Sequence, residues 1–118
     1  MDKKNPLLEL SFEFALEIIQ YTEELENKGK HVIARQLLKS GTSIGANCRE
    51  AQSAESLQDF IHKLKIAAKE SEETEYWLLL CKHSRNYPEV KDLIEKNLQV
   101  KKLLSSIISS SKKRLQTK

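Results

Sequence analysis

Apolar residues recur at helical spacing along almost the whole chain, and no alternation of apolar and polar residues lasts long enough to predict a strand. Residues that end helices divide this pattern into amphipathic segments. Pro6 suits a first helical turn, Gly29 suits a turn between helices, and Pro88 cannot continue a helix. The pattern predicts four helices, at residues about 6–28, 31–54, 56–86 and 89–109.

The third segment has the most regular pattern, with apolar and small residues alternating three and four positions apart as in a coiled-coil seam. The seam consists of Leu57, Phe60, Leu64, Ala67, Ser71, Thr74, Leu78 and Cys81. Short connections between four such helices favour antiparallel neighbours. We therefore expect an all-α protein with one domain, residues 1–118, folded as an antiparallel up-down-up-down four-helix bundle. A serine-rich stretch after residue 104 predicts fraying, followed by a basic, partly disordered tail at 110–118.

Two glycines lie inside the second predicted helix, at Gly41 and Gly45. Each costs about 1 kcal/mol relative to alanine, so their presence needs a compensating reason. Because they lie four residues apart, both face the same side of the helix. We expect a neighbouring helix to approach closely there, which points to packing and assembly.

Polar residues at helical spacing form a second feature of the central helices. Inside a bundle they must hydrogen-bond one another, and such a network fixes register and partner choice. The candidate helix-packing and polar-network residues are Ser40, Gly41, Ser43, Gly45, Asn47, Glu50, Ser71, Thr74 and Glu75.

Charge is distributed unevenly along the chain, whose net charge is +3. Residues 5–28 carry six acidic side chains and one basic one, whereas residues 88–118 carry eight basic and three acidic ones. The first and last helices, or neighbouring subunits, could attract each other through these charges; alternatively, the basic end could bind nucleic acid. We favour the first interpretation. The candidate nucleic-acid contacts are Lys101, Lys102, Lys112, Lys113 and Arg114.

The sequence contains no recognisable motif for catalysis or for cofactor binding. Glu70, Glu72, Glu73 and Glu75 crowd one part of a helix, but no glutamate is followed three residues later by histidine, as di-metal bundles require. No phosphate-binding glycine loop occurs. We expect no enzyme activity, no catalytic residue, no cofactor and no bound metal.

The sequence also indicates the cellular location of the protein. No apolar run approaches the length of a membrane span, and the first residues do not resemble a signal peptide. The two cysteines, Cys48 and Cys81, fall on apolar helical stripes and are expected to be buried free thiols. We expect a cytoplasmic protein without a membrane partner.

Three stretches of the chain resemble a known family: Gln36–Asn47 followed by Glu50 and Ala51, then Asp59–Leu64, then Glu70 with Glu73–Leu78. They resemble the bacterial four-helix-bundle family (S23-like) named for proteins encoded in intervening sequences of large-subunit ribosomal RNA genes. The accessory variability proteins of diversity-generating retroelements are its relatives. The resemblance covers nearly the whole chain and implies an up-down bundle that assembles as a ring-like pentamer. For the retroelement branch it also implies binding to a reverse transcriptase and nucleic acid.

Two functions from different classes remain open at this point. The first is a non-enzymatic homo-oligomeric scaffold or adaptor, a pentamer, which binds a protein partner. The alternative is an RNA- or DNA-binding accessory protein that partners a reverse transcriptase or ribosomal RNA. No motif in the sequence indicates the cellular process in which the protein takes part.

Overall fold

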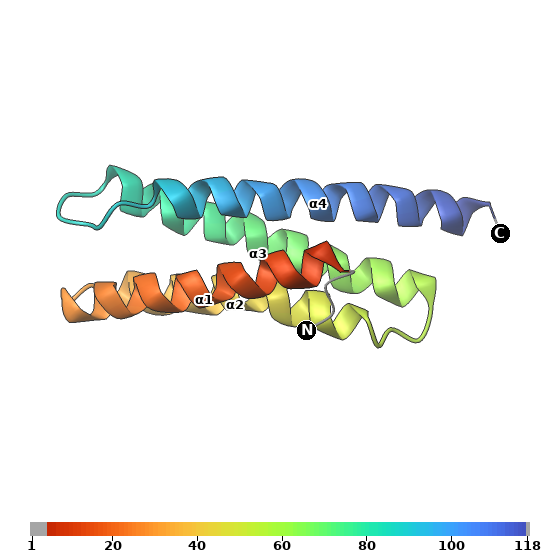
Figure 1. The fold of residues 1–118 in the computed structure, drawn as a ribbon, viewed down its shortest axis with the longest axis horizontal. Coiled ribbons are helices and arrows are strands. Elements are labelled where there is room, and N and C mark those ends of the chain that lie inside the picture. Colours follow the sequence, from red (N-terminus) through yellow and green to blue (C-terminus); the bar gives the residue numbers. More distant parts are fainter. Residues whose placement is uncertain (1–4, 118) are drawn as a thin grey trace.

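The protein, described here for residues 5–117 in a computed structural model, consists of four helices connected by short turns (Figure 1). They are α1 (Pro6–Asn27), α2 (His31–Ala51), α3 (Leu57–His83) and α4 (Lys91–Gln116). Successive helices run in opposite directions, and no strand occurs within the described residues. The predicted all-α four-helix bundle is confirmed.

Local side-chain chemistry explains where α1 and α3 begin. The Asn5 side chain accepts a hydrogen bond from the backbone N–H of Leu8, 3.1 Å away, and Pro6 occupies the first turn of α1. Ser56 caps α3 in the same manner, with its hydroxyl 3.0 Å from the Asp59 nitrogen. These contacts satisfy backbone donors that have no partner inside the helix.

Three helix ends differ by three residues or more from the sequence-based bounds. Helix α3 ends at His83 rather than near residue 86. Helix α2 ends at Ala51 rather than near residue 54, because the chain turns there to reach Ser56. Helix α4 continues to Gln116, so the predicted end near residue 109 and the tail from 110 are corrected. Ser111 is buried, and Lys113 and Arg114 place positive charge at the negative end of the helix dipole.

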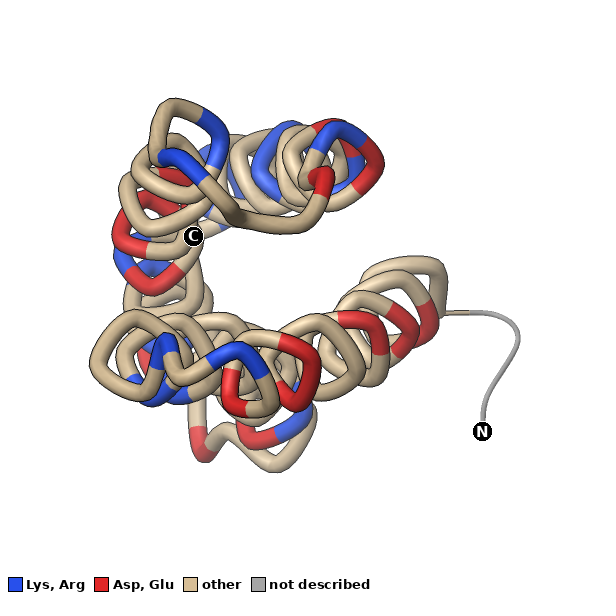
Figure 2. The backbone as a smooth tube through the Cα atoms, turned by 90° about the vertical axis from the view of Figure 1, so that its left-hand side faces the viewer, with Lys and Arg blue, Asp and Glu red and all other residues tan. Residues whose placement is uncertain are grey.

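The hydrophobic core runs along the bundle axis. Its largest fully buried apolar side chains come from all four helices: Leu7, Phe14, Ile18, Leu25, Leu37, Ile44, Leu64, Leu78, Val100 and Leu104. Helices α1, α2 and α3 pack closely in chain order, as do α3 and α4, whereas α1 and α4 contact each other less. Seen end on, the helices follow a C shape, with α1 and α4 as its two ends (Figure 2).

Candidate functional site

The two glycines of α2 face α1. A Cβ atom added to Gly41 would lie 2.9 Å from the Cγ1 atom of Ile18, a fully buried side chain. One added to Gly45 would lie 3.3 Å from the backbone oxygen of Ser11. Since 2.9 Å is well inside normal carbon–carbon contact, any side chain at Gly41 would displace the core of α1. The glycines thus permit the close α1–α2 approach that their spacing predicted.

The buried polar residues form two separate pairs between helices. The hydroxyls of Ser40 on α2 and Thr74 on α3 hydrogen-bond each other across 2.9 Å. Ser71 on α3 donates to Oδ1 of Asn97 on α4 at 2.9 Å, and the Asn97 amide donates to the Ser71 backbone oxygen at 3.1 Å. All four residues are buried, so each pair ties one helix to its neighbour.

The other predicted network residues do not join these pairs. Ser43 donates to the Lys39 backbone oxygen, and Asn47 donates to the Ser43 backbone oxygen, both within α2. Glu50 forms an exposed ion pair with Lys63 of α3, at 3.2 Å. The expected single network is therefore corrected to two pairs plus local surface bonds, because Ser43 and Asn47 point along their own helix.

Sequence reasoning missed Asn97, although a signal for it was present. It interrupts an apolar stripe of α4 formed by Leu93, Val100 and Leu104, at the spacing of inward-facing positions. A polar residue in such a stripe must find a partner inside the bundle, which here is Ser71.

Lys101, one of the predicted nucleic-acid contacts, forms ion pairs within the molecule. Its ammonium lies 3.0 Å from carboxylates of both Glu72 and Glu75 on α3. Partial burial acts to lower the pKa of Lys101, but the hydrogen bonds to Glu72 and Glu75 outweigh it, and the pKa is raised. Lys101 therefore serves to join α4 to α3.

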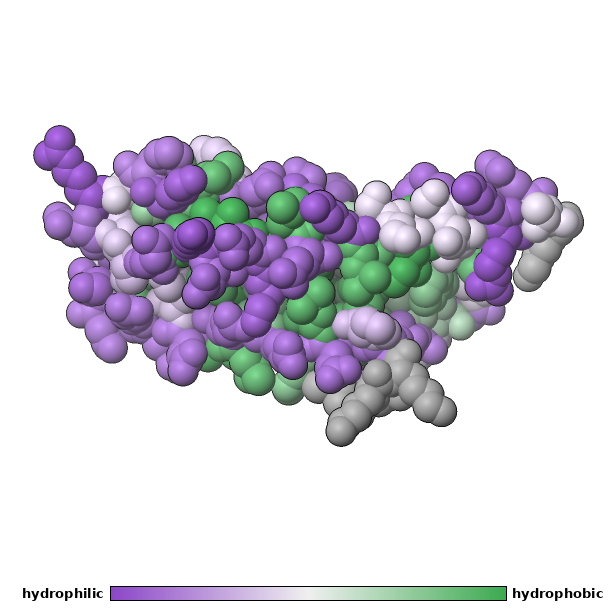
Figure 3. Space-filling view, turned by 45° about the horizontal axis from the view of Figure 1, so that its top comes forward, coloured by the Kyte–Doolittle hydropathy of each residue, from purple (hydrophilic) through white to green (hydrophobic). Residues whose placement is uncertain are grey.

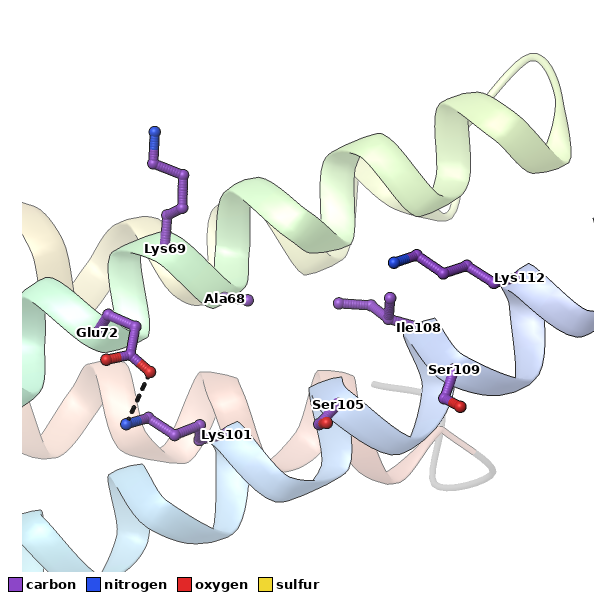
Figure 4. Close-up of a pocket in the computed structure, with 8 residues that line it drawn as sticks. All are labelled: Ala68, Lys69, Glu72, Lys101, Ser105, Ile108, Ser109 and Lys112. Atoms are coloured by element: carbon purple, nitrogen blue, oxygen red, sulfur yellow. Dashed lines mark ion pairs between the residues drawn. The ribbon is translucent and has the colours of Figure 1, made fainter.

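Lys101 and Lys112 line a groove of about 550 Å³ between α3 and α4 (Figure 4). Ala68 and Ile108 contribute apolar surface to it, and Figure 4 shows Lys69 pointing away from α4. The positive charge of the groove is thus offset at one end by Glu72, and Lys69 and Lys112 are its lining cations that form no ion pair with any described residue.

The remaining predicted contacts lie on other sides of α4. Because each residue turns the helix by about 100°, Lys102 and Lys113 share a side that differs from the side of Lys101 and Lys112. Arg114 lies on a third side, beside a hollow lined by Ala51 and Phe60. The five residues therefore do not converge on one patch.

Both cysteines are buried free thiols, as predicted. Burial raises the pKa of Cys48 to about 11, although a hydrogen bond with Ser11 acts in the opposite direction. Burial also raises the pKa of Cys81, beside Tyr21. Neither thiol is activated as a nucleophile, since activation requires a lowered pKa.

Residues 5–117 contain neither a metal-binding cluster nor a membrane-spanning helix. Within this part of the chain, no group of three or more histidine, cysteine or carboxylate side chains is placed to hold a metal ion. None of the helices described is both long enough and apolar enough to cross a bilayer.

These features define the class of the protein: an antiparallel four-helix bundle whose helices are held in register by a close glycine contact and two buried polar pairs. The chain belongs to the 23S rRNA-intervening sequence protein family, whose model matches residues 3–106. The predicted family is confirmed. Lys112, Lys113 and Arg114 lie beyond the matched residues.

A solved structure agrees with this assignment. The chain is similar to a protein of unknown function from the S23 ribosomal protein family of Bacteroides thetaiotaomicron, with 44% identity and a TM-score of 0.83. The match covers 86% of this chain and 97% of the other. The comparison with curated proteins returns no match. The relation to the accessory variability proteins of retroelements stays a prediction.

Proposed function

We propose that the protein is a non-enzymatic scaffold or adaptor of the bacterial cytoplasm that self-associates into a homo-oligomer and binds a protein partner. The number of subunits, five, rests on the family resemblance. The proposal also assigns no cofactor and no metal to the protein.

Large apolar side chains on the outer side of α1 carry the proposal. Phe12, Leu16 and Ile19 are 43%, 52% and 39% exposed, although the bundle interior is already filled by other residues. Phe12 also borders a hollow of about 290 Å³ between α1 and α2. Elsewhere, the space-filling view shows green apolar atoms exposed among polar side chains over the middle of the molecule (Figure 3). Contiguous apolar surface of this kind is typical of protein–protein contacts.

The oligomeric state tests the proposal directly. Light scattering on the purified protein at micromolar concentration should give a mass several times that of the 13.6 kDa chain. Phe12→Ser combined with Leu16→Ser should shift the equilibrium toward monomer. Val32→Ser combined with Leu115→Ser, which removes exposed apolar side chains elsewhere, should leave the mass unchanged. A parent protein that is monomeric under these conditions would refute self-association.

Nucleic-acid binding is the alternative function, and one observation favours it. Lys112, Lys113 and Arg114 are exposed at the end of α4, and none forms an ion pair with any other described residue. Repetition of this weakly basic end around an oligomer would multiply its affinity for phosphates. Such binding would be sequence-tolerant and strongly dependent on salt.

Retention of RNA or DNA at low salt tests the alternative. If it holds, replacing Lys112, Lys113 and Arg114 by glutamate should abolish retention without unfolding the bundle, because all three are exposed. Lys65, Lys82 and Arg85, also exposed, provide a control with the same change in charge. If the nucleic-acid-free parent retains no single- or double-stranded RNA or DNA, the alternative fails and the adaptor proposal stands.

A further inference from the structure

The outer side of α1 combines acidic and apolar residues and carries no basic residue, since no lysine or arginine occurs between Pro6 and Asn27. At helical spacing it presents Glu9, Phe12, Glu13, Leu16, Ile19 and Glu23, which we call the acidic face. Leu16 lies at its centre and is 52% exposed. Glu13 lies three residues before Leu16, and Glu23 lies seven residues after it.

The outer side of α4 has the opposite character. Lys91, Glu95, Leu98 and Lys102 follow one another at intervals of four, three and four residues, so they share one side of the helix, which we call the basic face. All four are exposed, and Leu98 is 43% exposed. Lys91 lies seven residues before Leu98, and Lys102 lies four residues after it. Read in the opposite chain direction, the lysines of the basic face therefore match the positions of Glu13 and Glu23 to within one residue.

The charges of the two faces form few contacts inside one molecule; Glu13 acts at longer range on Lys96, whose pKa it helps to raise. Among the described residues, the single ion pair that joins α1 and α4 links Glu17 to Lys96, at the seam between the two helices. Glu13 and Glu23 form no ion pair within residues 5–117, and the same holds for Lys91 and Lys102. Both faces are thus available to a second molecule.

We infer that the acidic face of one copy docks antiparallel against the basic face of the next copy. This assignment rests on the proposed self-association and names the two surfaces that carry it. Leu16 meets Leu98 of the next copy at the centre. Glu23 then lies level with Lys91, and Glu13 lies within one residue, about 1.5 Å, of the level of Lys102. Seven residues of helix span about 10 Å in both partners, and the other spacings differ by one residue, so the charged positions agree to within about 1.5 Å when the leucines are level.

The reverse, parallel orientation is disfavoured by charge. With Leu16 again opposite Leu98, Glu9 would face Lys91, but Glu13 would face Glu95, since each lies three residues before its leucine, and Glu23 would face the uncharged Ser105. Like charges placed opposite each other weaken an interface. In the antiparallel orientation the position opposite Glu95 falls at Ile19, which is uncharged.

The antiparallel orientation also leads to a ring. Within one molecule α1 and α4 already run in opposite directions, so this docking leaves all copies pointing the same way, as cyclic symmetry requires. The axial offset between copies is small as well. Inside one molecule Glu17 of α1 lies level with Lys96 of α4, and between molecules Leu16 lies level with Leu98. The two α4 helices are therefore shifted along the axis by about one residue, or roughly 1.5 Å. A head-to-tail contact with little axial shift gives a ring when its rotation from copy to copy also closes.

Charge reversal tests the two faces against each other. Sedimentation equilibrium and circular dichroism should be measured for the parent, for Glu13→Lys with Glu23→Lys, for Lys91→Glu with Lys102→Glu, and for the chain carrying all four changes. Each double variant should remain folded and have a dissociation constant raised about tenfold or more. The quadruple variant should recover the assembly of the parent, because its reversed charges are again complementary. Glu55→Lys with Glu73→Lys is the control for net charge and should assemble normally.

The outcomes separate this inference from the proposed function. An oligomeric parent whose double variants assemble equally well would overturn the two faces while leaving self-association intact. Loss of assembly in the double variants without recovery in the quadruple variant, or loss in the control, would overturn the pairing as well. A monomeric parent would remove the proposed function itself.

Discussion

Gly41 marks the tightest approach between α1 and α2, and it allows a direct test of packing. Gly41→Leu should lower the free energy of unfolding by about 2 kcal/mol, because overlap with buried Ile18 exceeds the gain of about 1 kcal/mol in helix propensity. Gly45→Leu should cost less, since Gly45 borders the hollow between α1 and α2. Urea denaturation followed by circular dichroism measures both variants.

The control for these variants is Ala46→Leu, an exposed position on the same helix that should change stability little. A Gly41→Leu variant as stable as the parent would mean that α1 can move away from α2 without loss.

From the raised pKa of the buried Cys48 thiol we predict how the free energy of unfolding depends on pH. Its folded pKa of about 11 exceeds the ordinary value of 9.0, because burial disfavours the thiolate. The protonated thiol thus stabilises the fold fully below pH 9, and this contribution is lost as pH rises toward 11. Between pH 8 and pH 10, the parent should lose about 1 kcal/mol more unfolding free energy than Cys48→Ala. Parallel pH profiles for parent and variant in urea denaturation would contradict the expected burial.

At the scale of the helix, Asn97 shows how a polar residue in the apolar stripe of α4 aligns this helix with α3. Asn97→Leu should destabilise the protein by about 1–3 kcal/mol, since the buried Ser71 hydroxyl loses its acceptor. Asn47→Leu is the matched control: Asn47 is only half-buried and bonds within α2, so the change should cost much less. Thermal unfolding of the two variants distinguishes them. Equal losses would indicate that neither amide has a special role.

The two asparagines also show which part of the candidate site the sequence could predict. Helical spacing placed Ser40, Ser71 and Thr74 on inward-facing sides, and all three are buried. The apolar stripe around Asn97 marks it as inward-facing, but helical spacing could not select which buried hydroxyl it pairs with. The choice of Ser71 follows from the rotation of α4 against α3.

For the whole molecule, the arrangement of helices predicts where local unfolding starts. Helices α2 and α3 each pack closely against two neighbours, whereas α1 and α4 each have one close neighbour and contact each other less. Hydrogen exchange should therefore be slowest at the centres of α2 and α3 and faster in α1 and α4. Mass spectrometry of the exchanging protein measures this order. Slowest exchange in α1 or α4 would contradict it, unless the effect disappears in a monomeric variant.

The sequence by itself determined the number of helices, the antiparallel bundle and the inward side of each helix, because apolar periodicity is a local property that repeats within two turns. Glycine spacing likewise marked the close contact of α2. Only the tertiary structure determined that α4 extends to Gln116, that Ser71 pairs with Asn97, and that Lys101 is held by two glutamates of α3. These features depend on the axial register and rotation of helices far apart in the chain, which packing of the whole core sets.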